Sequence, residues 1–111
     1  MRADLSPSGP NIVQASFSAA TSADIVAAVA GKVIRVYGMD LSSAGTVTIT
    51  VKDGTTALEG ARTLAAGTPW TPRHPIPGRP AYQTTAGNAF VGTFGGAVQI
   101  SGSVWYSVGD A

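Results

Sequence analysis

The feature that most constrains the fold is a strict two-residue alternation over residues 46–52. The valines and the isoleucine of this segment point to one side of an extended chain, and its threonines point to the other side. This period is typical of a β-strand that buries one face and exposes the other to solvent. Asp53 and Gly54 follow directly, and this pair favours a tight two-residue turn. We therefore predict a strand over residues 46–52 that leads into a hairpin.

The preceding segment, residues 32–41, is apolar on both faces. Such a segment is expected between two neighbours inside a sheet, so we predict a central strand. For residues 21–30 two alternatives stay open, a short helix capped by Ser22 or Asp24 and a short strand, of which an all-β context favours the strand. The remaining strands are predicted at residues 11–19, 55–59, 81–85, 88–94 and 98–108.

The composition agrees with an all-β fold, because 14 glycines and seven prolines in 111 residues provide frequent turns. About eight strands separated by turns predict a single-domain antiparallel β-sandwich that is jelly-roll-like. We expect the sandwich to occupy residues 11–111 and residues 1–10 to form an extended N-terminal arm. The arm is either a frayed terminus or a segment that becomes ordered on a neighbouring subunit.

Glycine and proline also predict two connections. Gly95 and Gly96 are expected to form a tight hairpin turn between the last two strands. Residues 68–80 hold five of the seven prolines, and they cannot form a central strand because proline lacks the backbone N–H donor. We expect an ordered, polyproline-like surface loop, which Trp70 and Ile76 anchor to the body of the domain.

The charge and residue content argue against several classes of function. Seven basic and six acidic side chains give a net charge of +1, which provides no electrostatic attraction to nucleic acid or to an anionic membrane. The absence of cysteine excludes disulfides and thiolate metal sites. No apolar run approaches the roughly 20 residues of a membrane span, and the first residues lack the apolar region of a secretory signal, so no export is expected.

The sequence carries no recognisable catalytic or metal-binding motif. His74 is the only histidine, and no cluster of metal ligands accompanies it. Nucleophile-elbow and phosphate-loop sequences are absent, and the six acidic residues are scattered. We therefore expect no enzymatic activity, no cofactor and no bound metal, although a carboxylate pair assembled only by folding leaves no sequence signature.

Aromatic and basic residues indicate where a partner would bind. Trp105 is predicted on the otherwise polar face of the last strand, where it is either exposed to a partner or covered by a loop. Basic residues and a tryptophan also gather in the Pro-rich residues 68–80, which form either a contact surface or a solvated loop. Together with residues of the arm, the predicted partner contacts are Arg2, Leu5, Pro7, Pro10, Trp70, Arg73, His74, Arg79 and Trp105.

Four stretches of the chain resemble small virion proteins of tailed bacteriophages. They are residues 25–36 (IVAAVAGKVIRV), 45–49 (GTVTI), 84–90 (TTAGNAF) and 98–104 (VQISGSV). Several proteins of this group are β-sandwich capsid decoration proteins, also called cement proteins. The resemblance implies a bacteriophage virion structural protein that is made in the host cytoplasm and resides on the capsid surface of the virion.

The resemblance also implies a partner and a mode of action. A decoration protein binds the assembled head and bridges neighbouring copies of the major capsid protein. A homo-oligomer is expected, with a homotrimer favoured over a homodimer, and with no direct contact to nucleic acid or membrane. The alternative is a tail or fibre module that binds a host-surface glycan or protein through exposed aromatic residues. A third hypothesis is a cellular β-sandwich binding module unrelated to phage.

Overall fold

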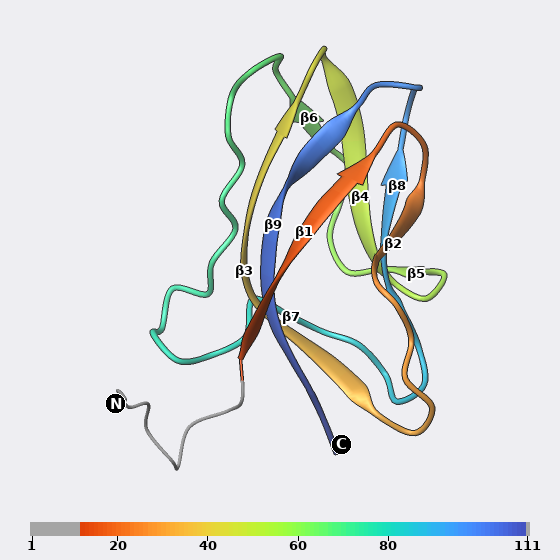
Figure 1. Cartoon of the computed structure of the whole chain (residues 1–111), viewed down its shortest axis with the longest axis vertical. Helices are drawn as coiled ribbons and strands as arrows, with labels where there is room; N and C mark the ends of the chain where they lie inside the picture. Colours follow the sequence, from red (N-terminus) through yellow and green to blue (C-terminus); the bar gives the residue numbers. More distant parts are fainter. Residues whose placement is uncertain (1–11, 111) are drawn as a thin grey trace.

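The structure of the protein is a computed structural model that describes residues 12–110, so the predicted arm at residues 1–10 lies outside the described residues. The described chain contains no helix and forms two antiparallel sheets that face each other (Figure 1). The nine strands are β1 (Val13–Ala19), β2 (Ala23–Val26), β3 (Val33–Ser43), β4 (Val47–Asp53), β5 (Thr56–Ala57), β6 (Arg62–Leu64), β7 (Tyr82–Gln83), β8 (Phe90–Phe94) and β9 (Ile100–Gly109).

The two sheets have different strand orders. One sheet runs β1-β9-β3-β7, and the other runs β2-β8-β4-β5 with β6 paired to β4 as well. The predicted all-β antiparallel sandwich is therefore confirmed, and so is the central position of β3, which lies between β9 and β7. The strand count exceeds the predicted eight because β6 falls in a stretch of small residues where the sequence shows no alternation.

The core lies between the sheets and is built by the predicted alternation. In β4 the valines and the isoleucine are buried, and the threonines between them are exposed or half-buried. In β3 the pairing with β9 shifts by one residue at Tyr37, so that Val36 and Met39 both face the core although they are three positions apart. The largest fully buried side chains are Phe90, Ile34, Met39, Leu41, Ile49, Ile100, Val36, Val51 and Val104.

Two further expectations concern residues 21–30 and the turn after β4. A strand and not a helix forms in the ambiguous residues 21–30, at Ala23–Val26. The predicted tight turn forms between β4 and β5, with Gly54 at a φ of 61°. It is displaced by one residue from the predicted Asp53-Gly54, because Asp53 is the last residue of β4 and pairs with Thr56. The two Asp53 oxygens also accept hydrogen bonds from Thr85 and Asn88. Burial alone would raise the pKa of Asp53, but the hydrogen bonds from Thr85 and Asn88 outweigh it and lower that pKa.

The predicted hairpin at Gly95 and Gly96 is wrong. Strand β8 lies in one sheet and β9 in the other, so the connection crosses between the sheets. The Gly95 N–H donates to the Thr48 carbonyl of β4 (2.9 Å) and not to β9. The physical reason is that β9 occupies the place between β1 and β3, where each of its edges finds a longer partner than β8.

The ladder between β3 and β9 is the longest in the fold, with ten residue pairs from Val33–Gly109 to Ser43–Ile100. Its two backbones approach closely at Gly102, which adopts a φ of 151°. A Cβ atom on Gly102 would lie 1.8 Å from the carbonyl oxygen of Asp40. Only glycine fits this position, because the contact is with backbone and no flexible side chain can move aside.

We therefore expect Gly102→Ala to lower the free energy of unfolding by about 3 kcal/mol through backbone strain and overpacking. Gly96→Ala is the matched control, since no atom lies within 4 Å of its added Cβ and its φ is not positive. Urea unfolding of both variants measures the difference. Equal stability of the two variants would contradict this view of the ladder.

Candidate functional site

The Pro-rich segment, residues 68–80, lies beside the edge of β3 that β9 does not use (Figure 1, green to cyan). Leu41 and Trp70 exchange two backbone hydrogen bonds: the Leu41 N–H donates to the Trp70 carbonyl (3.0 Å), and the Trp70 N–H donates to the Leu41 carbonyl (2.7 Å). Nearer β6, the Gly67 N–H donates to the Ser43 carbonyl (2.8 Å). The segment is thus fastened to the sheet by its backbone, and it covers part of the edge of β3.

The remainder of this edge is covered after the segment returns to the sheet. The Ala81 N–H donates to the Val36 carbonyl (2.7 Å), and the Thr84 N–H donates to the Ile34 carbonyl (2.9 Å). Residues 70–84 therefore follow β3 antiparallel, after an isolated parallel bridge between Ala66 and Ser43, while residues 74–80 form a loop between the two antiparallel parts. We call residues 74–80 the projecting loop.

Proline placement explains this interrupted pairing. A proline offers no N–H to a neighbouring strand, so a regular ladder cannot run through residues 69–77, and only the amide groups between the prolines pair with β3. The predicted surface loop is accordingly ordered, but part of it pairs with β3 as an irregular edge. An edge occupied by prolines does not accept another strand.

The two predicted anchors behave differently. Trp70 packs against the hydrophobic core, as predicted. The prediction for Ile76 is wrong, because its relative exposure is 51%. The difference follows from position: Trp70 lies where the segment pairs with β3, whereas Ile76 lies in the projecting loop.

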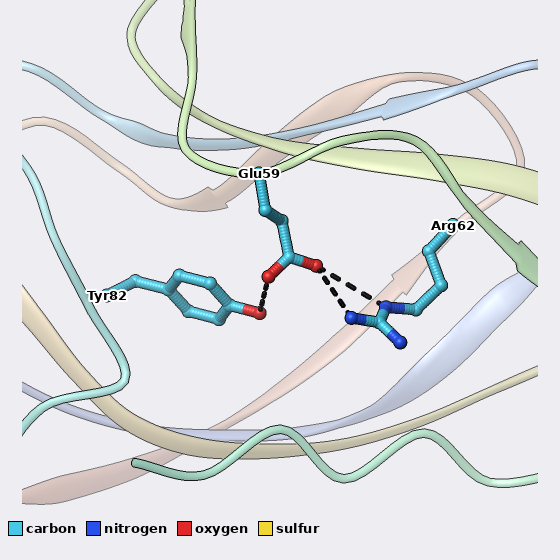
Figure 2. Close-up of polar contacts among 3 residues, drawn as sticks. All are labelled: Glu59, Arg62 and Tyr82. Carbon is cyan, nitrogen blue, oxygen red and sulfur yellow. Dashed lines mark hydrogen bonds and ion pairs between the residues drawn. The ribbon is translucent and has the colours of Figure 1, made fainter.

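A polar cluster joins the segment to the other sheet, and Figure 2 shows Glu59 between Tyr82 and Arg62. The Tyr82 hydroxyl donates to Glu59 Oε1 (2.9 Å), and Arg62 donates to Glu59 Oε2 through Nη2 (3.1 Å) and Nε (3.3 Å). The Arg62 guanidinium also lies over the Trp70 ring, 5.1 Å from its centroid. Because Tyr82 belongs to β7 and Arg62 to β6, this cluster bridges the two sheets.

The environment of Tyr82 keeps its hydroxyl protonated. Burial raises the pKa of Tyr82 most, and the hydrogen bond and negative charge of Glu59 raise this pKa further, well above its ordinary value. The phenol therefore remains a hydrogen-bond donor to Glu59 throughout the neutral range. Ionisation would place two negative charges in direct contact.

This pKa shift predicts how stability depends on pH. Because the pKa of Tyr82 is higher in the folded state, its contribution to stability is complete below the unfolded pKa of about 10 and is lost as the pH rises through the folded pKa. We expect the stability of the wild type relative to Tyr82→Phe to decline above about pH 10. Urea unfolding at a series of alkaline pH values tests this, and a difference that stays constant with pH would contradict it.

A second arginine contacts the predicted tryptophan. Arg73 Nη1 donates to the Met39 carbonyl (3.0 Å), and the guanidinium lies 5.6 Å from the centroid of the Trp105 ring. Gly38 makes room for it, since a Cβ atom there would lie 2.2 Å from Arg73 Nη1. Trp105 is on the outer face of its sheet as predicted, and of the two alternatives it is partly covered, by one side chain of the Pro-rich segment.

Removing Arg73 should uncover this ring. In a Trp70→Phe background Trp105 is the remaining tryptophan, so its fluorescence reports on the contact alone. We expect Arg73→Ala to increase acrylamide quenching of Trp105 and to cost about 1 kcal/mol of stability, which is the scale of an exposed cation–π contact. Arg79→Ala is the matched control, and equal quenching in the two variants would contradict the contact.

Two hollows flank Arg73. The larger, about 490 Å³, lies between the Pro-rich segment and the Glu59 cluster, and its walls include Trp70, Tyr82 and His74. The smaller, about 270 Å³, is lined by Ile12, Tyr37, Gly38, Arg73 and Trp105. His74 Nδ1 accepts a hydrogen bond from the Ile76 N–H (2.9 Å).

The structure thus brings together four of the predicted contacts, which are Trp70, Arg73, His74 and Trp105. Arg79 lies apart from them, exposed in the projecting loop. The predicted contacts Arg2, Leu5, Pro7 and Pro10 lie outside the described residues. Sequence reasoning missed Glu59 and Arg62, because nothing in their local sequence distinguishes them from the other scattered charges.

No group of three or more histidine, aspartate or glutamate side chains able to hold a metal ion occurs within residues 12–110. The same residues contain no helix long and apolar enough to cross a membrane.

Three comparisons relate the chain to known proteins. No protein-family model matches the chain, and no curated protein matches it. A solved structure of Bacillus endospore appendages, described as disulfide-linked pili, is similar over 94% of this chain and 91% of that chain, with 20% sequence identity and a TM-score of 0.45. At this identity and TM-score, the likeness does not bear on function.

Proposed function

We propose that this chain is a structural protein of a bacteriophage virion, a capsid decoration protein that attaches to the head through its projecting loop. The proposal rests on one observation, which is how the sheet holds this loop. Backbone pairing with β3 holds it at both ends, and it presents Ile76 and Arg79 to solvent. The resemblance of four stretches to phage virion proteins supports the same assignment.

A loop held in this way suits attachment to a rigid shell. Its conformation is set before binding, so little conformational entropy is lost when it docks. An exposed isoleucine supplies apolar area for a contact, and burial of one such side chain stabilises an interface by about 1.5–3 kcal/mol. Several copies of this weak contact, linked in a homo-oligomer, combine through effective concentration into firm attachment to the major capsid protein.

The proposal is tested with the Ile76→Asp variant. We expect its binding to phage heads to be weakened about tenfold or more, because a charged side chain replaces the apolar contact. Val29→Asp is the matched control: Val29 has a similar relative exposure (42%, against 51% for Ile76) but lies in the connection between β2 and β3. The measurement is co-sedimentation with heads and tails separated from the phage whose genome carries the gene.

Saturable binding to heads that Ile76→Asp weakens and Val29→Asp preserves would support the proposal. Binding only to tails, or equal binding by the two variants, would contradict it. A gene that lies outside any phage genome, without neighbours encoding a capsid protein, portal or terminase, would also contradict it.

A second candidate function rests on the larger hollow. Trp70 and Tyr82 provide aromatic walls there, and Glu59, Arg62 and His74 provide polar groups, a combination typical of small-ligand sites. A tail or fibre module would use such a hollow for a host glycan. Glycan-array binding that is kept in Ile76→Asp and lost in a folded Trp70→Ala variant would favour this candidate over decoration.

A further inference from the structure

Strand β1 forms an edge of the sandwich that has no partner in the described part of the chain. Strand β1 pairs with β9 through seven consecutive residue pairs, from Val13–Tyr106 to Ala19–Ile100, with no register shift. At its other edge, β1 makes no backbone hydrogen bond to any residue of 12–110. Unpaired N–H and C=O groups in a row form a template for another strand.

The other edges of the described fold are unsuited to accept a strand. The far edge of the same sheet is occupied by β7 and the Pro-rich segment. In the second sheet, β2 has four residues, a register shift and the charged Asp24, whereas β5 and β6 have two and three residues. Strand β1 is therefore the long, regular edge of the described structure.

The composition of β1 adds to this contrast. Edge strands that must stay single usually carry lysine, other charges, proline or a bulge. Strand β1 reads VQASFSA and has none of these residues. On its outer face Gln14, Ser16 and Ser18 are exposed, and these small polar groups are compatible with a strand beside them.

We infer that β1 pairs antiparallel with β1 of a second copy of this chain, around a two-fold axis at Ser16. The two four-stranded sheets then form one continuous sheet across a dimer. A second copy of this chain is the favoured partner, because the side chains of β1 complement those of an antiparallel β1. The axis places Val13 opposite Ala19 and Ala15 opposite Phe17, so that each large side chain of the inner face meets a small one.

The same register pairs polar groups on the outer face. Ser16 lies opposite Ser16 of the second copy, Gln14 lies opposite Ser18, and no like charges meet. Val13, whose relative exposure is 43%, gains a neighbour in the dimer. Such an interface is isologous and gives a closed dimer, the less favoured of the two oligomeric states expected from the sequence.

The inference is independent of the attachment proposed for the projecting loop, because β1 and the Pro-rich segment occupy opposite edges of one sheet. A dimer paired through β1 therefore leaves both projecting loops accessible. Failure of head binding would leave the dimer in place, and loss of the dimer would weaken head binding only through lost avidity.

Charge pairing at the two-fold axis provides the test. Ser16→Lys places two positive charges opposite each other in the dimer, and Ser16→Glu places two negative charges there. We expect the full-length wild type to be dimeric by sedimentation equilibrium, and each variant alone to dissociate with a Kd raised about tenfold or more. An equimolar mixture of the two variants should restore a dimer containing one copy of each.

Ser42→Lys is the matched control, since Ser42 lies on the outer face of the same sheet but in the central strand β3, and it should remain dimeric. Restoration in the mixture also shows that both variants fold. A monomeric wild type would overturn the inference. An oligomer unaffected by the Ser16 variants, or a mixture that does not associate, would overturn it too.

Discussion

The backbone ladder between β3 and β9 is the interaction on which the rest of the structure depends. It joins residues 33–43 to residues 100–109, so this pairing closes the long stretch of chain at residues 44–99. Strand β9 carries β1 on its other side, and β3 carries the Pro-rich segment. The close backbone approach at Gly102 therefore supports both surfaces that we connect with function.

The two edges of the sheet that contains this ladder differ in a way that suits assembly. At one edge, prolines interrupt the pairing with β3, and the Glu59 cluster bridges to the other sheet. This edge accepts no further strand, but it holds the projecting loop in a defined position. The opposite edge, β1, offers an uncharged and regular strand. We propose that one edge provides a loop for attachment to a different protein and that the other provides a strand for association with an identical chain.

The elements that depend on local periodicity were predictable from the sequence. Residues 46–52 and 32–41 form the strands expected, because alternation along a strand needs no knowledge of its partners. The choice of sheet was not predictable, and the glycine pair after β8 was therefore mistaken for a hairpin. At the site, Trp70, Arg73 and Trp105 stood out by residue type. Their contacts could not be predicted from the sequence. Arg73 reaches Trp105 only because β3 places Gly38 beneath it. Tyr82 contacts Glu59, which lies 23 positions away in the sequence.

The central claim is that the Pro-rich segment is fixed to the sandwich before any partner binds. Amide hydrogen exchange followed by NMR tests this most directly, because the Leu41 and Trp70 N–H groups form the two hydrogen bonds that hold the segment to β3. Both amides should exchange slowly in the free protein, with protection close to that of the amides in the β3–β9 ladder. Exchange of the Trp70 amide at the rate of an unstructured peptide, with the ladder still protected, would contradict the account.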